Sequence, residues 1–121
     1  MAAVVAAART RLASPETKEL AANALISLVS HSAIADAAGS QGVLVLMIDM
    51  LRAQPPVALA VAALQCACLL MYGRGDMCRL AADSGLQQAL RAEHCAEYGA
   101  DFDAVSRNAE CALQLYSKMS A

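Results

Sequence analysis

The chain has 121 residues, of which 59% are hydrophobic, and a formal net charge of −2. That length supports one domain with a substantial core but not two domains. With balanced charge, no tryptophan, one phenylalanine and three tyrosines, the chain lacks the basic face and stacking aromatics that nucleic-acid binding requires. Much of the apolar excess is alanine, the strongest helix former, and no stretch alternates like a strand, so we predict an all-α protein.

The N-terminal third is predicted to be helical throughout. Residues 3–12 stand where the repeat described below places a helix. Ser14-Pro15-Glu16 is a typical helix start, because serine caps the first turn, proline suits the first position and an acid favours the positive end. It predicts a helix over residues 15–30, and a short helix is expected to follow over residues 31–38.

The middle of the chain contains two strongly apolar helices. A glycine-containing break at 39–42 precedes the first, which we predict over residues 43–52. Pro55-Pro56 ends that segment, because proline lacks an amide hydrogen and disfavours helix in the residue before it. A long helix is predicted over residues 57–72, with Gly73 as its left-handed cap.

The C-terminal third is predicted to repeat this order. A short helix over 76–82 leads to Gly85, which precedes a helix over 86–96. Residues 98–103 are expected to form a loop. A last helix is predicted over residues 104–119.

A pattern of small and branched apolar residues at helical spacing occurs three times, in residues 21–28, 62–69 and 109–115. Successive copies begin 41 and 47 residues apart. Helical units with periods of roughly 40–47 residues are typical of α-solenoids, in which each unit buries its apolar face against its neighbours. The longer second period indicates an insertion of about six residues near 93–103, by comparison with the first.

This three-helix order resembles the armadillo repeat, which has a glycine opening its second helix and an apolar core in its third. Gly42 and Gly85, 43 positions apart, carry the resemblance together with the third-helix sets Ala21/Leu25/Leu28, Ala62/Cys66/Leu69 and Ala109/Leu113. Val105 also fits the pattern, whereas Thr17 and Ala58 depart from it.

The resemblance implies a right-handed α-solenoid, with a partial repeat at 1–30 and full repeats at 31–73 and 74–121. Solenoids usually need about three units and polar caps to be stable alone. We therefore expect the chain to be a fragment of a longer solenoid, a homo-oligomer or an obligate subunit.

The resemblance also implies a non-enzymatic scaffold that binds protein partners, because third helices line the groove of armadillo proteins. Family members that bind basic localisation signals use a tryptophan and an asparagine on this face, and neither stands at the corresponding positions here. We predict instead that a partner helix or apolar segment lies along residues spaced by four on the third helices. The predicted partner-binding residues are Asn23, Ser27, Leu64, Cys68, Tyr72, Arg107, Cys111 and Leu115.

The alternative function is that of a membrane-associated helical protein. Residues 53–73 carry no charge, and about 20 apolar residues can cross a bilayer. Two features argue against a transmembrane helix in this segment: Pro55-Pro56 at one end and Gln65 in the middle. A central solenoid helix buried on nearly all sides accounts for the same segment.

No catalytic, metal or cofactor site is expected. Cys66 and Cys68, two apart on a helix, point to roughly opposite faces and cannot share one tetrahedral ion. His94 and Cys95 diverge for the same reason, and no acid is placed to orient the histidine. Asp49 interrupts an apolar helix, so we expect it to be partly buried and paired with Arg52.

The cysteine content predicts the compartment. Five cysteines are an odd set, unsuited to a disulfide framework, and no secretory signal precedes them. We therefore expect reduced thiols in an intracellular, cytoplasmic protein. Residues 1–15 contain two arginines and no acid, which keeps a mitochondrial presequence as the alternative.

Overall fold

The computed structural model describes residues 14–29, 42–72 and 74–120, and this part of the chain is almost entirely helical. It contains no strand, which confirms the all-α prediction for the described residues. The helices are α2 (Pro15–Val29), α4 (Val43–Arg52), α5 (Val57–Met71), α6 (Gly75–Asp83), α7 (Leu86–Leu90), the 3-10 helix η1 (Glu93–Glu97) and α8 (Ala100–Ser120). The helices predicted over 3–12 and 31–38, and the cap at Gly73, lie outside the described residues.

The start of α2 follows from its capping sequence. The Thr17 amide donates to Ser14 Oγ at 3.2 Å, so serine satisfies one of the first amides of the helix. The bounds of α4 match the predicted 43–52, and α5 ends one residue before the predicted 72. Local sequence therefore determines these three helices well.

Two predictions in the C-terminal third are wrong. The helix expected over 86–96 ends at Leu90, and Ala92 is extended (φ −61°, ψ 145°) before η1 begins. The loop expected over 98–103 is mostly helix, because α8 begins at Ala100. Gly99 makes the turn with φ 89°, and the acids Asp101 and Asp103 favour the positive start of the helix that follows.

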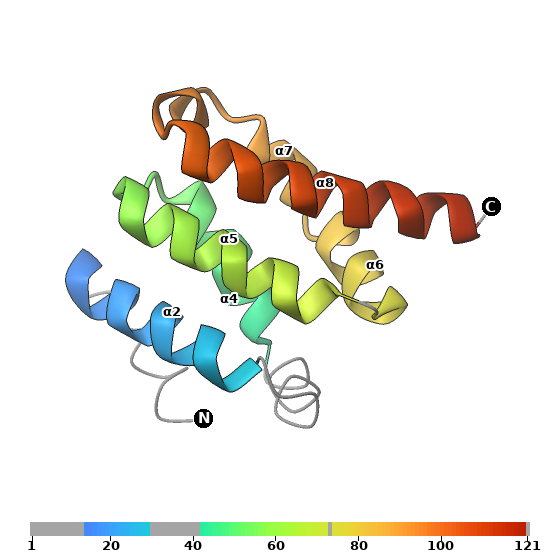
Figure 1. Cartoon of the computed structure of the whole chain (residues 1–121), viewed down its shortest axis with the longest axis horizontal. Helices are drawn as coiled ribbons and strands as arrows, with labels where there is room; N and C mark the ends of the chain where they lie inside the picture. The colour runs from blue at the N-terminus through green and yellow to red at the C-terminus, as the bar shows by residue number, and fades with distance from the viewer. Residues whose placement is uncertain (1–13, 30–41, 73, 121) are drawn as a thin grey trace.

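Three long helices lie side by side and run in the same direction (Figure 1). Helix α5 lies in the middle, with α2 packed on one side and α8 on the other. Helix α4 packs against α5 and against α7, which lies behind α8 in this view. The result is a layer of three parallel helices backed by shorter ones.

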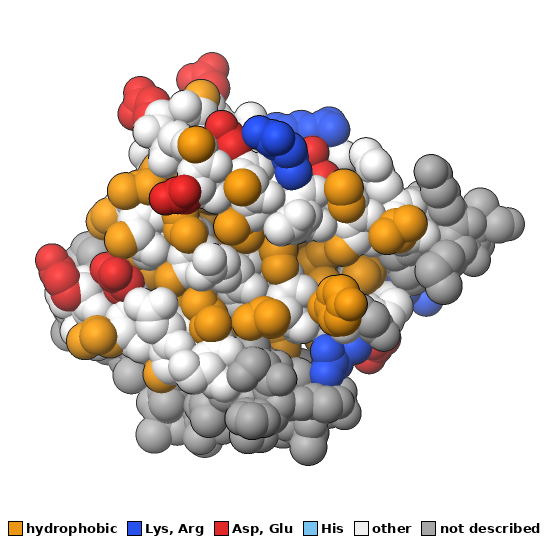
Figure 2. Space-filling model, in the orientation of Figure 1, with side chains coloured by type: hydrophobic (Ala, Val, Ile, Leu, Met, Phe, Trp, Pro, Cys, Tyr) orange, Lys and Arg blue, Asp and Glu red, His pale blue; other side chains and the backbone are white. Residues whose placement is uncertain are grey.

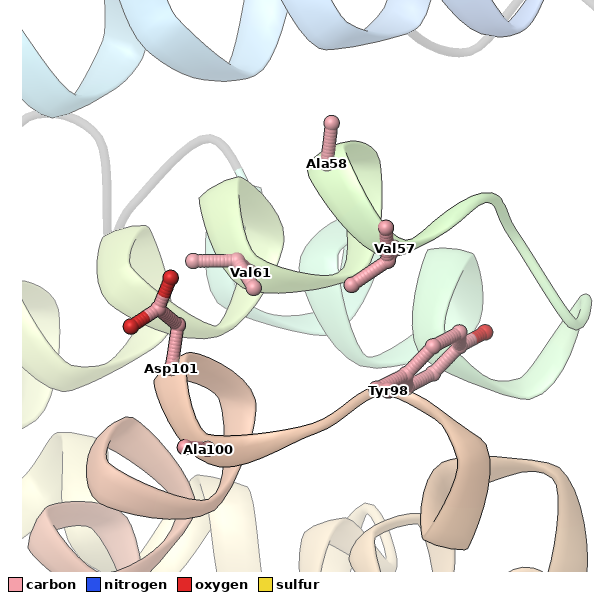
Figure 3. Close-up of a pocket in the computed structure, with 6 residues that line it drawn as sticks. All are labelled: Val57, Ala58, Val61, Tyr98, Ala100 and Asp101. Atoms are coloured by element: carbon pink, nitrogen blue, oxygen red, sulfur yellow. The ribbon is translucent and has the colours of Figure 1, made fainter.

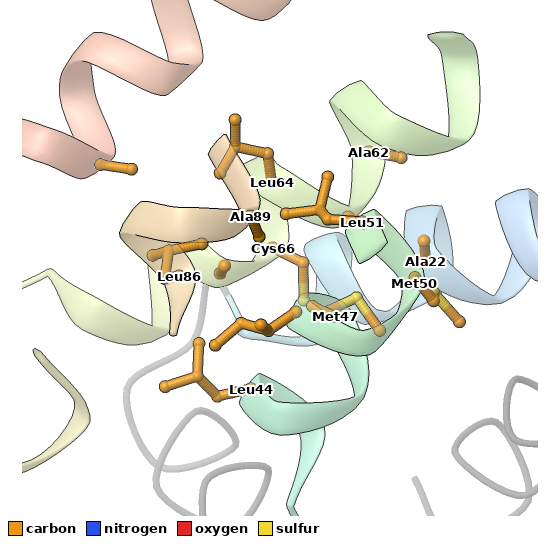
Figure 4. Close-up of a cluster of buried hydrophobic side chains, with 14 of the residues drawn as sticks. Ala22, Leu44, Met47, Met50, Leu51, Ala62, Leu64, Cys66, Leu86 and Ala89 are labelled. Carbon is orange, nitrogen blue, oxygen red and sulfur yellow. The ribbon is translucent and has the colours of Figure 1, made fainter. Parts of the chain in front are cut away.

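The core is centred on α4 and α5. Six of the ten residues of α4 are buried, and α5 buries residues around most of its circumference because helices cover it on several sides. Side chains from α4, α5 and α7, including Met47, Cys66 and Leu86, converge in one cluster (Figure 4). The many alanines of α5 permit close approach of its neighbours.

The two glycines that carry the repeat pattern share one backbone conformation. Gly42 and Gly85 both have positive φ, 75° and 83°, and each immediately precedes a helix. At Gly85 the space is also limited, since an added Cβ would collide with the Arg52 guanidinium. Arg52 donates from the end of α4 to the carbonyl of Ser84, which ties α4 to the turn between α6 and α7.

Asp49 is exposed rather than partly buried, so that prediction is wrong, while its predicted partner is correct. Its carboxylate lies 3.7 Å from the Arg52 guanidinium, and both side chains are about half or more exposed. The carboxylate points outward because the other faces of α4 are occupied by the core. Within the described ranges, no helix has both the length and the apolar character needed to cross a bilayer.

Candidate partner-binding face

The exposed side of α2, α5 and α8 forms what we term the three-helix face, which is turned toward the viewer in Figures 1 and 2. Hydrophobic side chains are scattered across it, where solvated helices would show mainly polar groups (Figure 2). The most exposed large apolar residues of the described chain are Leu20 and Val57 together with Tyr72 (82% exposed) and Leu115 (61%). They come from all three helices.

Seven of the eight predicted partner-binding residues are at least partly accessible. Cys68 is half-buried, and the other six are exposed: Asn23, Ser27, Tyr72, Arg107, Cys111 and Leu115. These side chains are therefore at least partly exposed on the surface. Their role in binding stays a prediction.

Leu64 is the exception, because it is fully buried (0% exposed) and cannot be a surface contact. The prediction for α5 is therefore wrong at Leu64, whereas Cys68 and Tyr72 are accessible. The accessible stripe of α5 passes instead through Ala58, Val61, Gln65, Cys68 and Tyr72. Since α5 has a neighbour on each side, only a narrow stripe of it remains accessible, whereas α2 and α8 at the ends of the row expose wider arcs.

Cys68 lies where α5 meets α8. Its thiol donates to the carbonyl of Val105 on α8 at 3.7 Å. Burial raises the pKa of Cys68 to about 11, and burial together with the nearby Cys68 raises the pKa of Cys66 to about 12. Both thiols therefore stay protonated at neutral pH and are poor nucleophiles.

A shallow hollow of about 370 Å³ opens between the start of α5 and the start of α8 (Figure 3). It is lined by Val57, Ala58 and Val61 from α5 and by Tyr98, Ala100 and Asp101 from the chain entering α8. We call this site the α5–α8 hollow. Its volume is at the small end of the roughly 300–1,000 Å³ typical of ligand sites, which suits one or two side chains better than a cofactor.

The Tyr98 wall of the hollow is held in place from two directions. The Tyr98 hydroxyl donates to the carbonyl of Pro55, in the turn between α4 and α5. Its ring lies 5.0 Å, between centroids, from the ring of Phe102, tilted by 58°, and Phe102 is buried. Burial, with a smaller contribution from Cys95 and then Glu97, raises the pKa of the Tyr98 phenol, so it remains a donor.

A second, smaller hollow of about 160 Å³ lies on the other side of the α4–α5 turn. It is lined by Lys18 of α2, Met50 of α4, residues 53–56 and Leu59 of α5. Both hollows thus flank the segment that begins α5. The two hollows are lined by residues on either side of the start of the helix: residues 53–56 in one, and Val57 and Ala58 in the other.

Charge is unevenly distributed over the three-helix face. In the view of Figure 2, acidic side chains lie over the side where the helices begin, and the basic ones lie toward the opposite side. Glu16 in the first turn of α2 and Asp101 and Asp103 in the first turn of α8 are exposed acids at this end. The α5–α8 hollow therefore lies in a negative surrounding.

Sequence reasoning missed the residues that line this hollow. Val57, the first residue of α5, is 47% exposed although its side chain is large and apolar compared with the many alanines of that helix. Tyr98 and Asp101 fall in residues 93–103, the segment that the sequence pattern predicts to be an insertion. An insertion that carries an aromatic residue and an acid was the available signal.

Among the described residues, no group of three or more His, Cys, Asp or Glu side chains lies close enough together to hold a metal ion.

A scan against models of known protein families finds no match, and searches of curated proteins and of solved structures find none either.

Proposed function

We propose that this chain is a non-enzymatic protein-interaction module, built as a right-handed, armadillo-like α-solenoid, that binds a partner polypeptide along the three-helix face. The proposal depends chiefly on one observation: three parallel helices lie in a row, and hydrophobic side chains are spread over their shared exposed side. Each of the three helices also has an exposed large apolar residue. Exposed apolar surface of this kind usually marks an interaction site.

Two features of the fold support the solenoid part of the proposal. Gly42 and Gly85 open α4 and α7 with the same left-handed backbone. Helix α4 also contacts α7 while α5 contacts α8, so like helices pack on like helices. In a solenoid, each unit contacts its neighbours through equivalent elements in this way.

The two thiols of α5 support a binding role better than a chemical one. The raised pKa values of Cys66 and Cys68 remove the thiolates that a nucleophilic mechanism requires. Tyr72, Leu115 and Val57 instead provide amphipathic and apolar contact area, which contributes strongly to protein interfaces.

The test compares variants of the full chain in affinity purification from native extract, with bound proteins identified by mass spectrometry. Tyr72→Asp and Leu115→Asp place a charge on the three-helix face, and Gln87→Asp places the same charge on exposed α7, away from it. We expect proteins captured by the parent and by Gln87→Asp to be lost from both face variants. Equal capture by all four proteins, with unchanged helical circular dichroism, would refute the proposal.

A further inference from the structure

The α5–α8 hollow combines three kinds of surface that together suit one type of side chain. Val57, Ala58 and Val61 form an apolar wall, Tyr98 provides an aromatic ring, and Asp101 provides a carboxylate. In Figure 3 the Asp101 carboxylate lies beside Val61 at one end of the hollow, and the Tyr98 ring lies at the other end, near Val57. A ligand that fills the hollow would therefore contact all three surfaces at once.

Arginine and lysine have the matching chemistry. Their aliphatic stems pack along apolar surface while the charged head reaches a polar group. A planar guanidinium forms two parallel charge-assisted hydrogen bonds with a carboxylate, which favours arginine over lysine at such a site.

The charges around the hollow favour a cation over an anion. The ion pairs of the described residues join Asp49 to Arg52 and Arg79 to Asp83, and neither involves Asp101. Asp103 and Glu16 add negative charge at the same end of the three-helix face. An anionic segment would be repelled there, whereas a basic one would be attracted.

The hollow is also organised before any ligand arrives. Tyr98 is fixed by its hydrogen bond to the Pro55 carbonyl and by its contact with the buried Phe102 ring. Asp101 is held in the first turn of α8, so its position is set by a regular helix. A preformed site reduces the entropy lost when a flexible side chain is bound.

We infer that the α5–α8 hollow binds one arginine or lysine side chain of an extended partner segment, with arginine preferred. The stem of that side chain lies along Val57 and Val61, and its charged head pairs with Asp101. This inference rests on the proposed function and adds the chemistry of the partner: a segment with a basic residue at the position that meets the start of α8.

The experiment selects 12-residue peptides from a random library displayed on phage, using the full chain as bait, and measures the best peptide by fluorescence anisotropy. Asp101→Asn removes the carboxylate charge of the hollow. Asp103→Asn is the matched control, because Asp103 is exposed in the same helix turn but does not line the hollow. Replacing the arginine of the peptide by citrulline, its neutral isostere, removes the charge from the other side.

We expect selected peptides to share one arginine or lysine. Asp101→Asn and the citrulline change should each weaken binding by roughly three- to fivefold, and the two losses should not add, because they remove the same pair. Asp103→Asn should change affinity by less than about twofold. The Asp101→Arg variant should bind the peptide in which glutamate replaces the arginine more tightly than it binds the arginine peptide.

Two other results separate the failure of this inference from the failure of the proposed function. Selected peptides without a basic residue, or equal losses at Asp101 and Asp103, overturn the inference but leave a peptide-binding face in place. If no peptide is enriched over the starting library, the inference is overturned. The proposed function then fails as well if the face variants also capture the same proteins as the parent.

Discussion

The two units that begin at Gly42 and Gly85 start alike and then diverge. In the first unit, α4 has ten residues and connects directly to α5 through a short turn. In the second, α7 has five residues, and an extended stretch and η1 intervene before α8. The second unit therefore has a smaller second helix and a longer connection.

The side chains at equivalent positions explain the difference. Ile48 is buried in α4, whereas Arg91, 43 positions later, is exposed and directly follows the last residue of α7. Without a buried apolar residue there, continuing the helix would gain little packing. The chain instead turns outward and supplies Tyr98 and Asp101 to the α5–α8 hollow. The comparison shows that one of the two helix pairs serves mainly the core while the other also shapes the surface.

The largest expected effect comes from Phe102, which anchors the longer connection. Phe102→Ala should lower the free energy of unfolding by about 3–5 kcal/mol, because it removes a fully buried ring. Urea denaturation followed by circular dichroism measures the change. Phe102→Leu, which keeps most of the volume, should lose less than half as much. A loss under about 1 kcal/mol in Phe102→Ala would mean that the connection is not anchored by this residue.

A pair of equivalent substitutions then tests the contrast between α4 and α7 directly. Ile48→Ala should cost about 2–4 kcal/mol, since Ile48 is completely buried. Arg91→Ala should change stability by no more than about 0.5 kcal/mol, because the side chain is exposed. Similar losses for the two variants in urea denaturation would contradict the explanation given for the short α7.

The left-handed glycines provide the next comparison. Gly85→Ala should lower stability by about 2–3 kcal/mol, because an alanine is strained at φ 83° and its Cβ displaces Arg52 from Ser84. Gly99→Ala has a similar φ of 89° but open space, so its cost should be about 1–2 kcal/mol. In an Arg52→Ala background, the extra loss of stability of Gly85→Ala relative to Gly99→Ala should disappear. If it persists, the collision with Arg52 is not its cause.

Much of the fold could be predicted from local sequence. The Ser14 cap, the diproline and the glycine before α4 fixed the bounds of α2, α4 and α5 almost to the residue. The divergent segment after Leu90 could not be predicted in this way. Residues 91–96 are compatible with a continued helix in local sequence, and the observed path depends on the exposure of Arg91, the burial of Phe102 and the turn at Gly99.

The candidate site was harder to predict than the fold. The accessibility of Leu115 and Tyr72 followed from the third-helix pattern, but Leu64 was misplaced, because the pattern alone does not say how closely neighbouring helices cover α5. The α5–α8 hollow depends on contacts between residues about 40 positions apart, such as Tyr98 with Pro55. Sequence periodicity contains no information about such contacts.

The smallest expected effect concerns the two connections, from α4 to α5 and from α7 to α8. Each contains one residue with a left-handed backbone. In the second unit this residue is Gly99, but in the first it is Gln54, with φ 56°. A residue with a Cβ pays roughly 1–2 kcal/mol for this conformation, whereas glycine adopts it freely at the expense of greater entropy in the unfolded chain. Gln54→Gly should therefore stabilise the protein by about 0.5–1 kcal/mol.

The matched control is the same substitution in an ordinary helical position. Gln65 is exposed in the middle of α5, so Gln65→Gly should destabilise the protein by about 1 kcal/mol. Opposite shifts of the urea midpoint in the two variants would establish that the short α4–α5 turn is strained at Gln54. If both variants lose stability equally, the left-handed backbone at Gln54 carries no excess energy, and the two connections differ in length alone.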